Sequence, residues 1–255
     1  MAQDISDIML SLCPCKLLSD KEEEKDMSEM DGTKDDMHEE LFINTDEKGD
    51  FWIAPESKEN YLNILSSGAD ALSKAKALSA VIECYRFEAF NDAGRLKKPT
   101  IVKIIETMRS VEQALGSESL GKILFYQGGR SESFRDYESA ATFYEESLAC
   151  EILDPEVRYW RLNNLAFCLN FLRCFEKAET YLKEAIFMKP LRYNAWKNLG
   201  VSFEHQGDFD RACDCYVQAM TCSNSEARSS AHFRRILERY PVLKKKYVKI
   251  KNGKE

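Results

Sequence analysis

The order of large, small and polar residues repeats along the chain between Tyr159 and about Asn224. When this stretch is shifted by one period of about 34 residues, large apolar positions align with large ones and small positions with small ones. Such a period predicts a solenoid in which each repeat is a pair of helices that stacks on its neighbours. The aligned pairs are Leu162 with Trp196, Leu165 with Leu199, Ala166 with Gly200, Leu169 with Phe203, Ala178 with Ala212, Leu182 with Tyr216, Ala185 with Ala219 and Pro190 with Asn224.

The small residues of this pattern have a packing role. Ala166 and Gly200 in the first helices, and Ala178 and Ala212 in the second, allow two antiparallel helices to approach closely. The large residues fill the space between them at i, i+3 and i+4 spacing. A larger side chain at Ala178 or Ala212 should therefore overpack the contact and cost about 1–3 kcal/mol.

The later unit resembles the tetratricopeptide repeat family. It reads Trp196-x-x-Leu199-Gly200-x-x-Phe203 and then Ala212-x-x-x-Tyr216-x-x-Ala219, which is similar to the family order of Trp, Leu-Gly, aromatic, Ala and aromatic. The earlier unit has Leu162 in place of the Trp and is closed by Pro190, whereas Asn224 stands where a closing Pro is usual. The resemblance implies an all-α, right-handed α-solenoid of helix–turn–helix repeats with helical caps.

A less regular unit precedes these two. Tyr137-x-x-Ala140-x-x-x-Tyr144 has the second-helix pattern, but Ala140 lies four positions too far from Ala178 to fit the period. The four extra residues fall near Pro155, as a longer second helix or a longer turn. We therefore expect three repeats within 118–225, at 118–155, 159–190 and 193–224.

The flanking segments predict caps and a tail. Residues 1–57 form an acidic, largely disordered segment, in which 41–54 is either a hairpin or a docking segment. Residues 58–117 form an N-terminal helical cap, with one long helix or two helices over 58–93 and a further helix from Pro99 to Gly116. Residues 226–255 hold a capping helix over 226–239 and a basic C-terminal tail, expected to be a solvated end.

Charge and composition exclude several functional classes. The net charge is −7, and residues 1–50 alone carry 16 Asp and Glu against 5 Lys. This balance disfavours nucleic acid as the principal partner. No apolar stretch approaches the roughly 20 residues of a membrane helix, and the chain lacks the basic start of a signal peptide. We therefore expect a cytoplasmic protein with no membrane partner, whose 9 cysteines are free thiols.

No catalytic or metal-binding constellation is evident. Cys213 and Cys215 lie two apart on an expected helix, so they point to different faces and do not form the usual zinc pair. Cys13 and Cys15 are expected to be free. His38, His205 and His232 belong to no defensible catalytic arrangement. The prediction is a non-enzyme that has no cofactor and no metal.

The resemblance also implies where a ligand binds, because first helices of successive family repeats line a concave peptide-binding groove. Asn amides can bond a peptide backbone, exposed aromatic rings can anchor apolar residues, and Arg favours carboxylates. The positions carried over are Trp160, Asn163, Asn164, Phe167, Asn170, Phe171, Asn194, Lys197, Asn198, Val201, Glu204, His205, Arg228, His232, Arg235 and Arg239.

These features predict an adaptor or scaffold that binds a partner's protein or peptide segment, with an acidic segment favoured. Lys197 and the Asn residues partly match the carboxylate-clamp members of the family, but the full set is absent. The alternative is a self-associating structural protein, a homodimer in which a second copy covers Trp160 and Phe167. A further hypothesis is that the acidic residues 1–50 occupy the groove until a partner displaces them.

Overall fold

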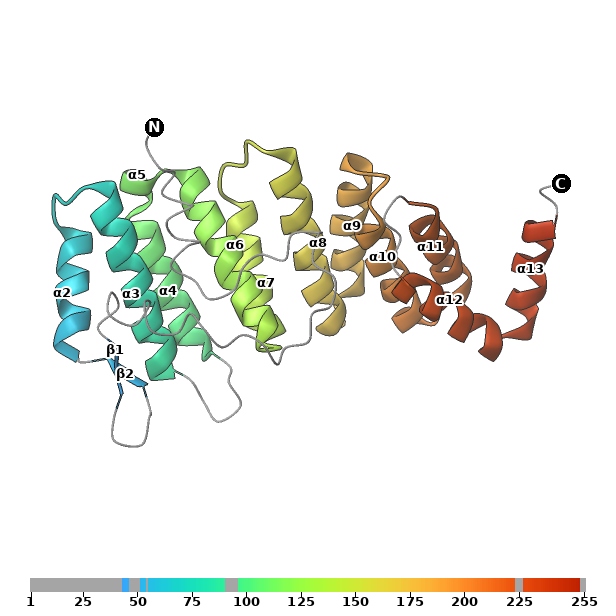
Figure 1. The fold of residues 1–255 in the computed structure, drawn as a ribbon, viewed down its shortest axis with the longest axis horizontal. Coiled ribbons are helices and arrows are strands. Elements are labelled where there is room, and N and C mark those ends of the chain that lie inside the picture. Colours follow the sequence, from blue (N-terminus) through green and yellow to red (C-terminus); the bar gives the residue numbers. More distant parts are fainter. Residues whose placement is uncertain (1–42, 46–50, 54, 90–95, 223–226, 253–255) are drawn as a thin grey trace. The chain divides into compact units, whose positions relative to one another are not determined.

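The structure is a computed structural model, and its placed residues fall into two units, which are described separately: Met1–Leu124 and Phe125–Glu255. The backbone is described for residues 43–45, 51–53, 55–89, 96–222 and 227–252 (Figure 1). Side chains are described for residues 58–86, 96–222 and 229–247. The acidic segment 1–42, including Cys13, Cys15 and His38, lies outside the described residues.

The first unit contains two short strands and a set of helices. Strand β1 (Ile43–Thr45) pairs antiparallel with β2 (Phe51–Ile53), inside the segment for which the sequence offers a hairpin. The helices are α2 (Pro55–Ser66), α3 (Ala71–Ala89), α4 (Lys98–Ser110), α5 (Glu112–Leu115) and the beginning of α6 (Ser117–Ser133).

Residues 58–93 thus contain two helices, and the alternative of one long helix is wrong. The break lies just before α3, where the Asp70 carboxylate accepts a hydrogen bond from the Ser73 amide at 2.9 Å. Such an N-cap satisfies a donor that a new helix would otherwise leave unpaired. Leu78 and Ile82 of α3 and Ile104 and Met108 of α4 are fully buried, so these helices form the core of this unit.

The second unit is a row of packed helices. α7 packs on α8, α8 on α9, α9 on α10, α10 on α11 and α11 on α12, and α8 also contacts α10 directly (Figure 1). This arrangement confirms the expected all-α solenoid of helix pairs. The bounds are α7 (Tyr137–Leu148), α8 (Pro155–Phe171), α9 (Phe175–Met188), α10 (Tyr193–Gln206), α11 (Phe209–Thr221), α12 (Ala227–Arg239) and α13 (Pro241–Asn252).

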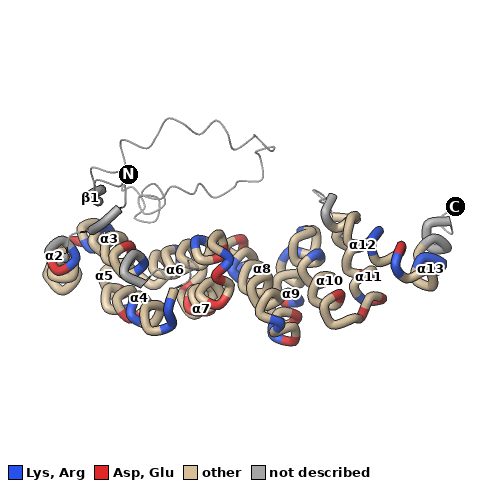
Figure 2. The backbone as a smooth tube through the Cα atoms, turned by 90° about the horizontal axis from the view of Figure 1, so that it is seen from below, with Lys and Arg blue, Asp and Glu red and all other residues tan. Residues whose placement is uncertain are grey.

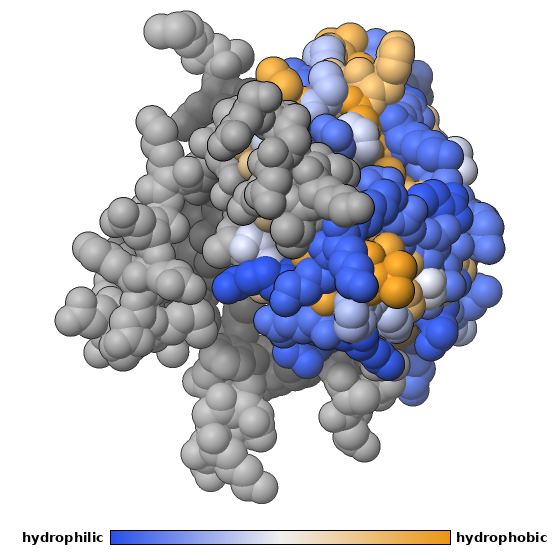
Figure 3. Space-filling model, turned by 90° about the vertical axis from the view of Figure 1, so that its right-hand side faces the viewer, coloured by the Kyte–Doolittle hydropathy of each residue, from blue (hydrophilic) through white to orange (hydrophobic). Residues whose placement is uncertain are grey.

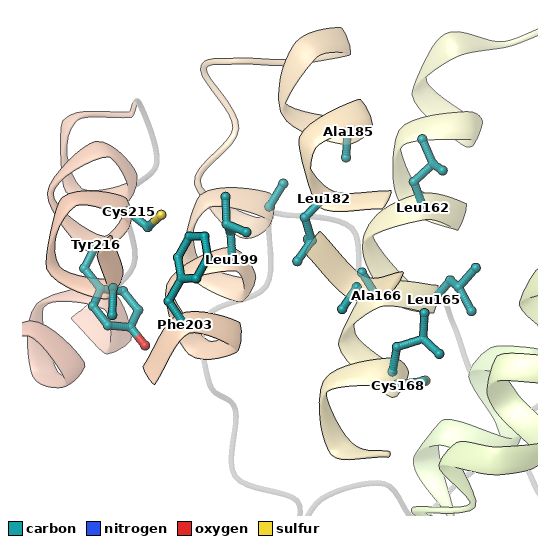
Figure 4. Packing of buried hydrophobic residues seen from close by; sticks show 14 of the residues in the cluster. Leu162, Leu165, Ala166, Cys168, Leu182, Ala185, Leu199, Phe203, Cys215 and Tyr216 are labelled. Carbon is teal, nitrogen blue, oxygen red and sulfur yellow. The ribbon is translucent and has the colours of Figure 1, made fainter. Parts of the chain in front are cut away.

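The predicted small positions lie in the core of this unit. Ala166, Ala178 and Ala212 are fully buried, and Figure 4 shows Leu182 directed into the space beside Ala166. At Gly200 the approach is closest, because a Cβ built there would lie 2.6 Å from the Cε1 atom of Tyr216. Gly200 therefore cannot take a side chain unless the Tyr216 ring moves.

The same arrangement occurs two repeats earlier in the chain. A Cβ at Gly128 would lie 2.5 Å from the Cδ1 atom of Tyr144, so the upstream repeat has the same glycine–tyrosine contact. In the middle repeat the equivalent positions are Ala166 and Leu182, and the smaller Leu side chain leaves room for a methyl group. The exchange of Gly and Tyr for Ala and Leu keeps the contact filled.

The sequence left two alternatives for the four extra residues of the upstream period, a longer second helix or a longer turn, and the longer second helix is wrong. α7 has 12 residues and α9 has 14, whereas α8 has 17 and α10 has 14. α8 begins at Pro155, four residues before the expected boundary at Tyr159, so the extra residues form its first turn. Asp154 caps this turn by accepting a hydrogen bond from the Glu156 amide at 2.8 Å.

The C-terminal basic run, which the sequence predicts to be a solvated end, is helical as far as Asn252, and its described lysines Lys244, Lys245 and Lys246 are exposed. α13 follows α12 after Tyr240 and docks through Tyr247, which is 8% exposed. The Tyr247 hydroxyl donates to Asp214 Oδ1 at 2.6 Å and lies 3.0 Å from the Asp210 carbonyl oxygen. Lys246 Nζ bonds Asp210 Oδ1 at 2.7 Å. The sequence pattern missed this contact because it joins residues that are far apart along the chain.

Candidate functional site

The candidate residues separate into three groups by exposure. Asn163, Asn170 and Asn198 are buried, with exposed fractions of 4%, 5% and 5%. A second group is half-buried: Trp160, Asn164, Phe167, Asn194, Lys197, Val201, Glu204 and His232. A third group is exposed: Phe171, His205, Arg235 and Arg239. The side chain of Arg228 lies outside the described residues.

The buried Asn side chains join α8 to α10. Asn198 Nδ2 donates to Asn163 Oδ1 at 3.0 Å, and Asn170 Nδ2 donates to the Asn198 carbonyl oxygen at 2.9 Å. Asn163 Nδ2 in turn donates to Asn164 Oδ1 at 3.1 Å. Buried amides of this kind are costly when unpaired, so these bonds serve the contact between repeats. Asn163, Asn170 and Asn198 are therefore less suited to hold a peptide backbone than the sequence suggested.

A hydrogen-bonded pair of a glutamate and a tyrosine occurs in two of the repeats. Tyr144 donates its hydroxyl to Glu132 Oε2 at 2.8 Å, and two repeats later Tyr216 donates to Glu204 Oε2, also at 2.8 Å. Burial raises the pKa of Glu132 more than the Tyr144 hydrogen bond lowers it. Asn164, on the next first helix, is a hydrogen-bond partner of the Tyr144 hydroxyl. Each pair therefore links the two helices of a repeat.

Glu204 has further partners on the following helix. His232 Nδ1 lies 3.0 Å from Glu204 Oε2, and Arg235 forms an ion pair with Glu204 Oε1. Burial alone would raise the pKa of Glu204, but the hydrogen bonds from His232, Tyr216 and Arg235 outweigh it and lower the pKa to about 2. Two residues predicted to attract a ligand's carboxylate, His232 and Arg235, are thus already engaged by a carboxylate of this chain.

Aromatic rings gather where α8 ends. Phe171 stacks on Tyr137 with ring centroids 4.1 Å apart, and its ring lies 5.0 Å from that of Phe167. Phe171 is nevertheless 54% exposed, so a large apolar surface remains open beside two supporting rings. Tyr137 is not among the groove positions predicted from the sequence. The signal was present, because Tyr137 begins a second helix as Phe175 and Phe209 do.

Phe175 and Phe209 show that this ring contact recurs. Phe175 stacks on His205 at 5.8 Å, and Phe209 stacks on Tyr240 at 4.3 Å. In each case the ring at the start of a second helix meets a ring at or just beyond the end of the next first helix. Aromatic pairs of this kind contribute about 0.5–1.5 kcal/mol each beyond the buried area. The ring of His205 is thus used in a contact between repeats.

Trp160 is held by the extra first turn of α8. Its Nε1 donates to Glu156 Oε1 at 3.1 Å, and the Arg192 guanidinium lies 5.2 Å from its ring. Glu156 also pairs with Lys189 at 3.2 Å and with Arg192. The position of the indole is therefore fixed by residues at the beginnings of α8 and α10, while the side chain stays half-buried.

The remaining candidate positions on α8 and α10 combine apolar and polar side chains. We call this set of positions the α8–α10 face and define it as Asn164, Phe167, Phe171, Asn194, Lys197 and Val201. Its chemistry is that of a binding surface, since rings can bury apolar groups and amide and ammonium groups can donate hydrogen bonds.

Within the described ranges, no group of three or more His, Cys, Asp or Glu residues is placed to hold a metal ion. Burial raises the pKa of both Cys213 and Cys215 to about 12, with nearby carboxylates adding to it, so these thiols stay protonated at neutral pH. No described helix is long and apolar enough to cross a membrane.

Comparisons with known proteins returned structures only. No protein-family model and no curated protein sequence matches the chain. The tetratricopeptide-repeat domain of Arabidopsis OM64 is 17% identical, with 48% of this chain and 98% of that chain covered and a TM-score of 0.44. Pseudomonas aeruginosa PilF is 16% identical, with coverages of 73% and 85% and a TM-score of 0.43. MamA is 16% identical, with coverages of 65% and 91% and a TM-score of 0.36.

Similarity at this level transfers no function to the chain, and the helical-repeat architecture follows from the molecule itself. The pattern of small and large positions recurs with one period from α8 and α9 to α10 and α11, and its glycine meets its tyrosine at Gly200 and Tyr216. The helices that carry this pattern pack in sequence from α7 to α12. The second unit is therefore an α-solenoid of stacked helix pairs.

Proposed function

We propose that this protein is a non-catalytic interaction module, an adaptor or scaffold, which binds a segment of a partner protein on the α8–α10 face. The observation that carries the proposal is Phe171, whose ring is 54% exposed although Tyr137 and Phe167 hold it in place. A rigid, exposed aromatic side chain is the usual anchor of a protein interface, because it buries much area and loses little entropy.

The neighbouring polar groups suggest what the segment contains. Lys197 is a half-buried ammonium group on α10, 5.9 Å from the Tyr193 ring centroid, and would favour a carboxylate. Asn164 and Asn194 provide amide groups for a peptide backbone. The fitting ligand is therefore a segment with one large apolar residue and an acidic residue near it.

The state of the cysteines supports a cytoplasmic location for this module. The described cysteines Cys84, Cys150, Cys168, Cys174, Cys213, Cys215 and Cys222 are free thiols, and all but Cys174 are buried. Free thiols in this number suit a reducing compartment, where disulfides are rare.

The proposal is tested by selecting peptides from a random display library on the full chain and titrating the selected peptides by calorimetry. The Phe171→Ser variant should lose about tenfold or more in affinity, as expected for removal of an aromatic anchor. Phe187→Ser is the matched control, because Phe187 is 89% exposed and is not part of the α8–α10 face. Equal loss in both variants, or no selected peptide, would contradict the proposal.

Self-association is the second candidate, and a different set of residues favours it. Leu153, Phe187 and Leu191 are 67%, 89% and 72% exposed, and they lie at or near the turns that lead into α8 and α10. Exposed apolar groups of this size are typical of contacts between copies. Light scattering over a dilution series decides: a dimer that resists dilution and dissociates in Phe187→Ser would favour assembly, and a monomer would exclude it.

A further inference from the structure

Helices α12 and α13 carry a strong excess of positive charge. Residues 227–252 contain nine Lys and Arg and a single acidic residue, Glu238, although the whole chain has a net charge of −7. Figure 2 shows Lys and Arg along both helices. We propose that the outer side of these two helices is a second binding surface, which recognises an acidic segment of a partner protein.

Two of these cations are used within the unit. Arg235 forms its ion pair with Glu204 of α10, and Lys246 bonds Asp210 of α11 at 2.7 Å. Together with Tyr247, which bonds Asp214, they attach both helices to the last complete repeat. The attachment matters for binding, because the remaining cations then lie on a fixed framework and the helices lose less conformational entropy when a ligand binds.

Four other cations define what we call the basic surface: Arg234, Arg239, Lys244 and Lys245. All four side chains are exposed, and none forms an ion pair with a described carboxylate. Arg234 Nε lies 3.4 Å from the Ser230 carbonyl oxygen, and the Arg239 guanidinium lies 5.6 Å from the Tyr240 ring centroid. Both Arg side chains are thus partly oriented, while their terminal nitrogens can still form paired hydrogen bonds to a carboxylate.

The apolar residues of these helices are turned inward. Ile236 and Tyr247 are 2% and 8% exposed, and Phe233 and Leu243 pack against the same core. Val242, at 81% exposed, is the exception among the described residues of the two helices. On the end of the molecule seen in Figure 3, hydrophilic residues predominate among the coloured atoms. Recognition here must therefore rest on charge, which favours fast, salt-sensitive association.

This arrangement selects an acidic protein segment over other anions. A helix that binds a lipid surface needs an exposed apolar face to insert, and among side chains 229–247 the large apolar residues other than Val242 are at least partly buried. Duplex DNA is a continuous array of charge, and a chain with net charge −7 repels it beyond these two helices. A short segment with several Asp or Glu can pair with exposed cations on these two helices without extending over the acidic remainder of the chain. The surface includes neither Phe171 nor Lys197, so the inference stands independently of the proposed function.

The test uses the full chain and a fluorescent peptide of ten glutamates as the probe. Anisotropy titrations compare the wild type with Arg234→Gln/Arg239→Gln/Lys244→Gln/Lys245→Gln, and each half of that variant separately. We expect the combined variant to bind the peptide with about tenfold lower affinity, and each half of it to show part of that loss, since exposed ion pairs contribute modestly one by one. The matched pair Lys177→Gln/Lys183→Gln on α9 removes the same charge as either half and should leave the affinity nearly unchanged. Circular dichroism checks that all variants stay folded.

Each other result would overturn the proposal. Equal losses in the α9 control and in either half would mean that the probe senses only net charge. No binding of the probe, or tighter binding of a short DNA duplex or of vesicles made from equal parts of phosphatidylcholine and phosphatidylserine, would exclude an acidic protein segment as the preferred ligand. Carbodiimide crosslinks from Lys244 or Lys245 to acidic residues within 1–50 of the free chain would assign the surface to the chain's own acidic segment.

Discussion

Glu204 illustrates how single polar residues fasten one repeat to the next. It accepts hydrogen bonds from Tyr216 within its own repeat and contacts His232 and Arg235 on α12. The equivalent Glu132 bonds Tyr144 in the same way, and burial raises its pKa. The pKa of this glutamate is therefore lowered in one repeat and raised in another, because the residues on the following helix differ.

The depressed pKa of Glu204 predicts a specific dependence of stability on pH. Its pKa falls from the ordinary value of 4.5 to about 2 on folding, so its contribution is complete above the unfolded pKa and is lost as pH falls toward 2. We expect the wild type to exceed Glu204→Gln in unfolding free energy by about 1–2 kcal/mol at pH 6, after allowance for solvent screening.

This prediction is measured by urea unfolding at pH values from 7 to 2.5. The difference between wild type and Glu204→Gln should shrink below about pH 4.5. Glu145→Gln is the control, because Glu145 is an exposed carboxylate of α7 for which the structure describes no ion pair. A difference between wild type and Glu204→Gln that stays constant down to pH 2.5 would contradict the assigned pKa.

The contact of Gly200 with Tyr216 predicts a coupled pair of mutations. Gly200→Ala should lower the unfolding free energy by about 1–3 kcal/mol, since its Cβ would lie 2.6 Å from the tyrosine ring. The cost should shrink in a Tyr216→Leu background, because the middle repeat has Ala166 with Leu182 at these positions. A double-mutant cycle in denaturant measures the coupling. An equal cost of Gly200→Ala in both backgrounds would show that the ring does not limit this position.

At the residue scale, the sequence predicted packing better than polar contacts. Ala178 and Ala212 are fully buried, as their period implied, because size patterns follow directly from helix geometry. The burial of Asn163 and Asn198 was not predictable, since an Asn at such a position can equally face solvent. Whether such an Asn is buried depends on a hydrogen-bond partner on the adjacent repeat, far along the chain.

At the scale of the element, the starts of the helices and the docking of the C-terminal helix can be compared with the expectations from the sequence. Asp136, Asp154 and Asp208 cap α7, α8 and α11, each by accepting a hydrogen bond from a backbone amide two or three residues later. The repeat period did not place all of these starts, since α8 begins at Pro155 and not at the expected boundary Tyr159. The docking of α13 was not predicted, because Tyr247 gains its partners on α11 only after the solenoid has formed.

The attachment of α13 can be tested as an element. Tyr247→Ala removes a buried ring and its hydrogen bonds to α11, so amide hydrogen exchange in 241–252 should become about tenfold faster or more as the helix detaches. Val242→Ala is the control, because Val242 is 81% exposed and its loss should change nothing. Exchange in α8 and α9 should stay as in the wild type. Unchanged exchange in 241–252 would mean that Tyr247 does not hold the helix.

At the scale of the whole molecule, the second unit offers two surfaces of different chemistry. The α8–α10 face has the exposed ring of Phe171 beside amides and Lys197, whereas the outer side of α12 and α13 has exposed cations and few open apolar groups. The sequence predicted a single face running across α8, α10 and α12. On α12, His232 and Arg235 already contact Glu204 of α10, so we propose that the α8–α10 face and the basic surface bind separately.

The most direct measurement is hydrogen exchange of the full chain with and without a display-selected peptide. We expect slower exchange in α8 and α10, over 155–171 and 193–206, with little change in α12 and α13. Protection confined to 227–252 would place the selected peptide on the basic helices and contradict the proposed role of the α8–α10 face. Protection spread evenly over the second unit would point to general stabilisation and would equally contradict it.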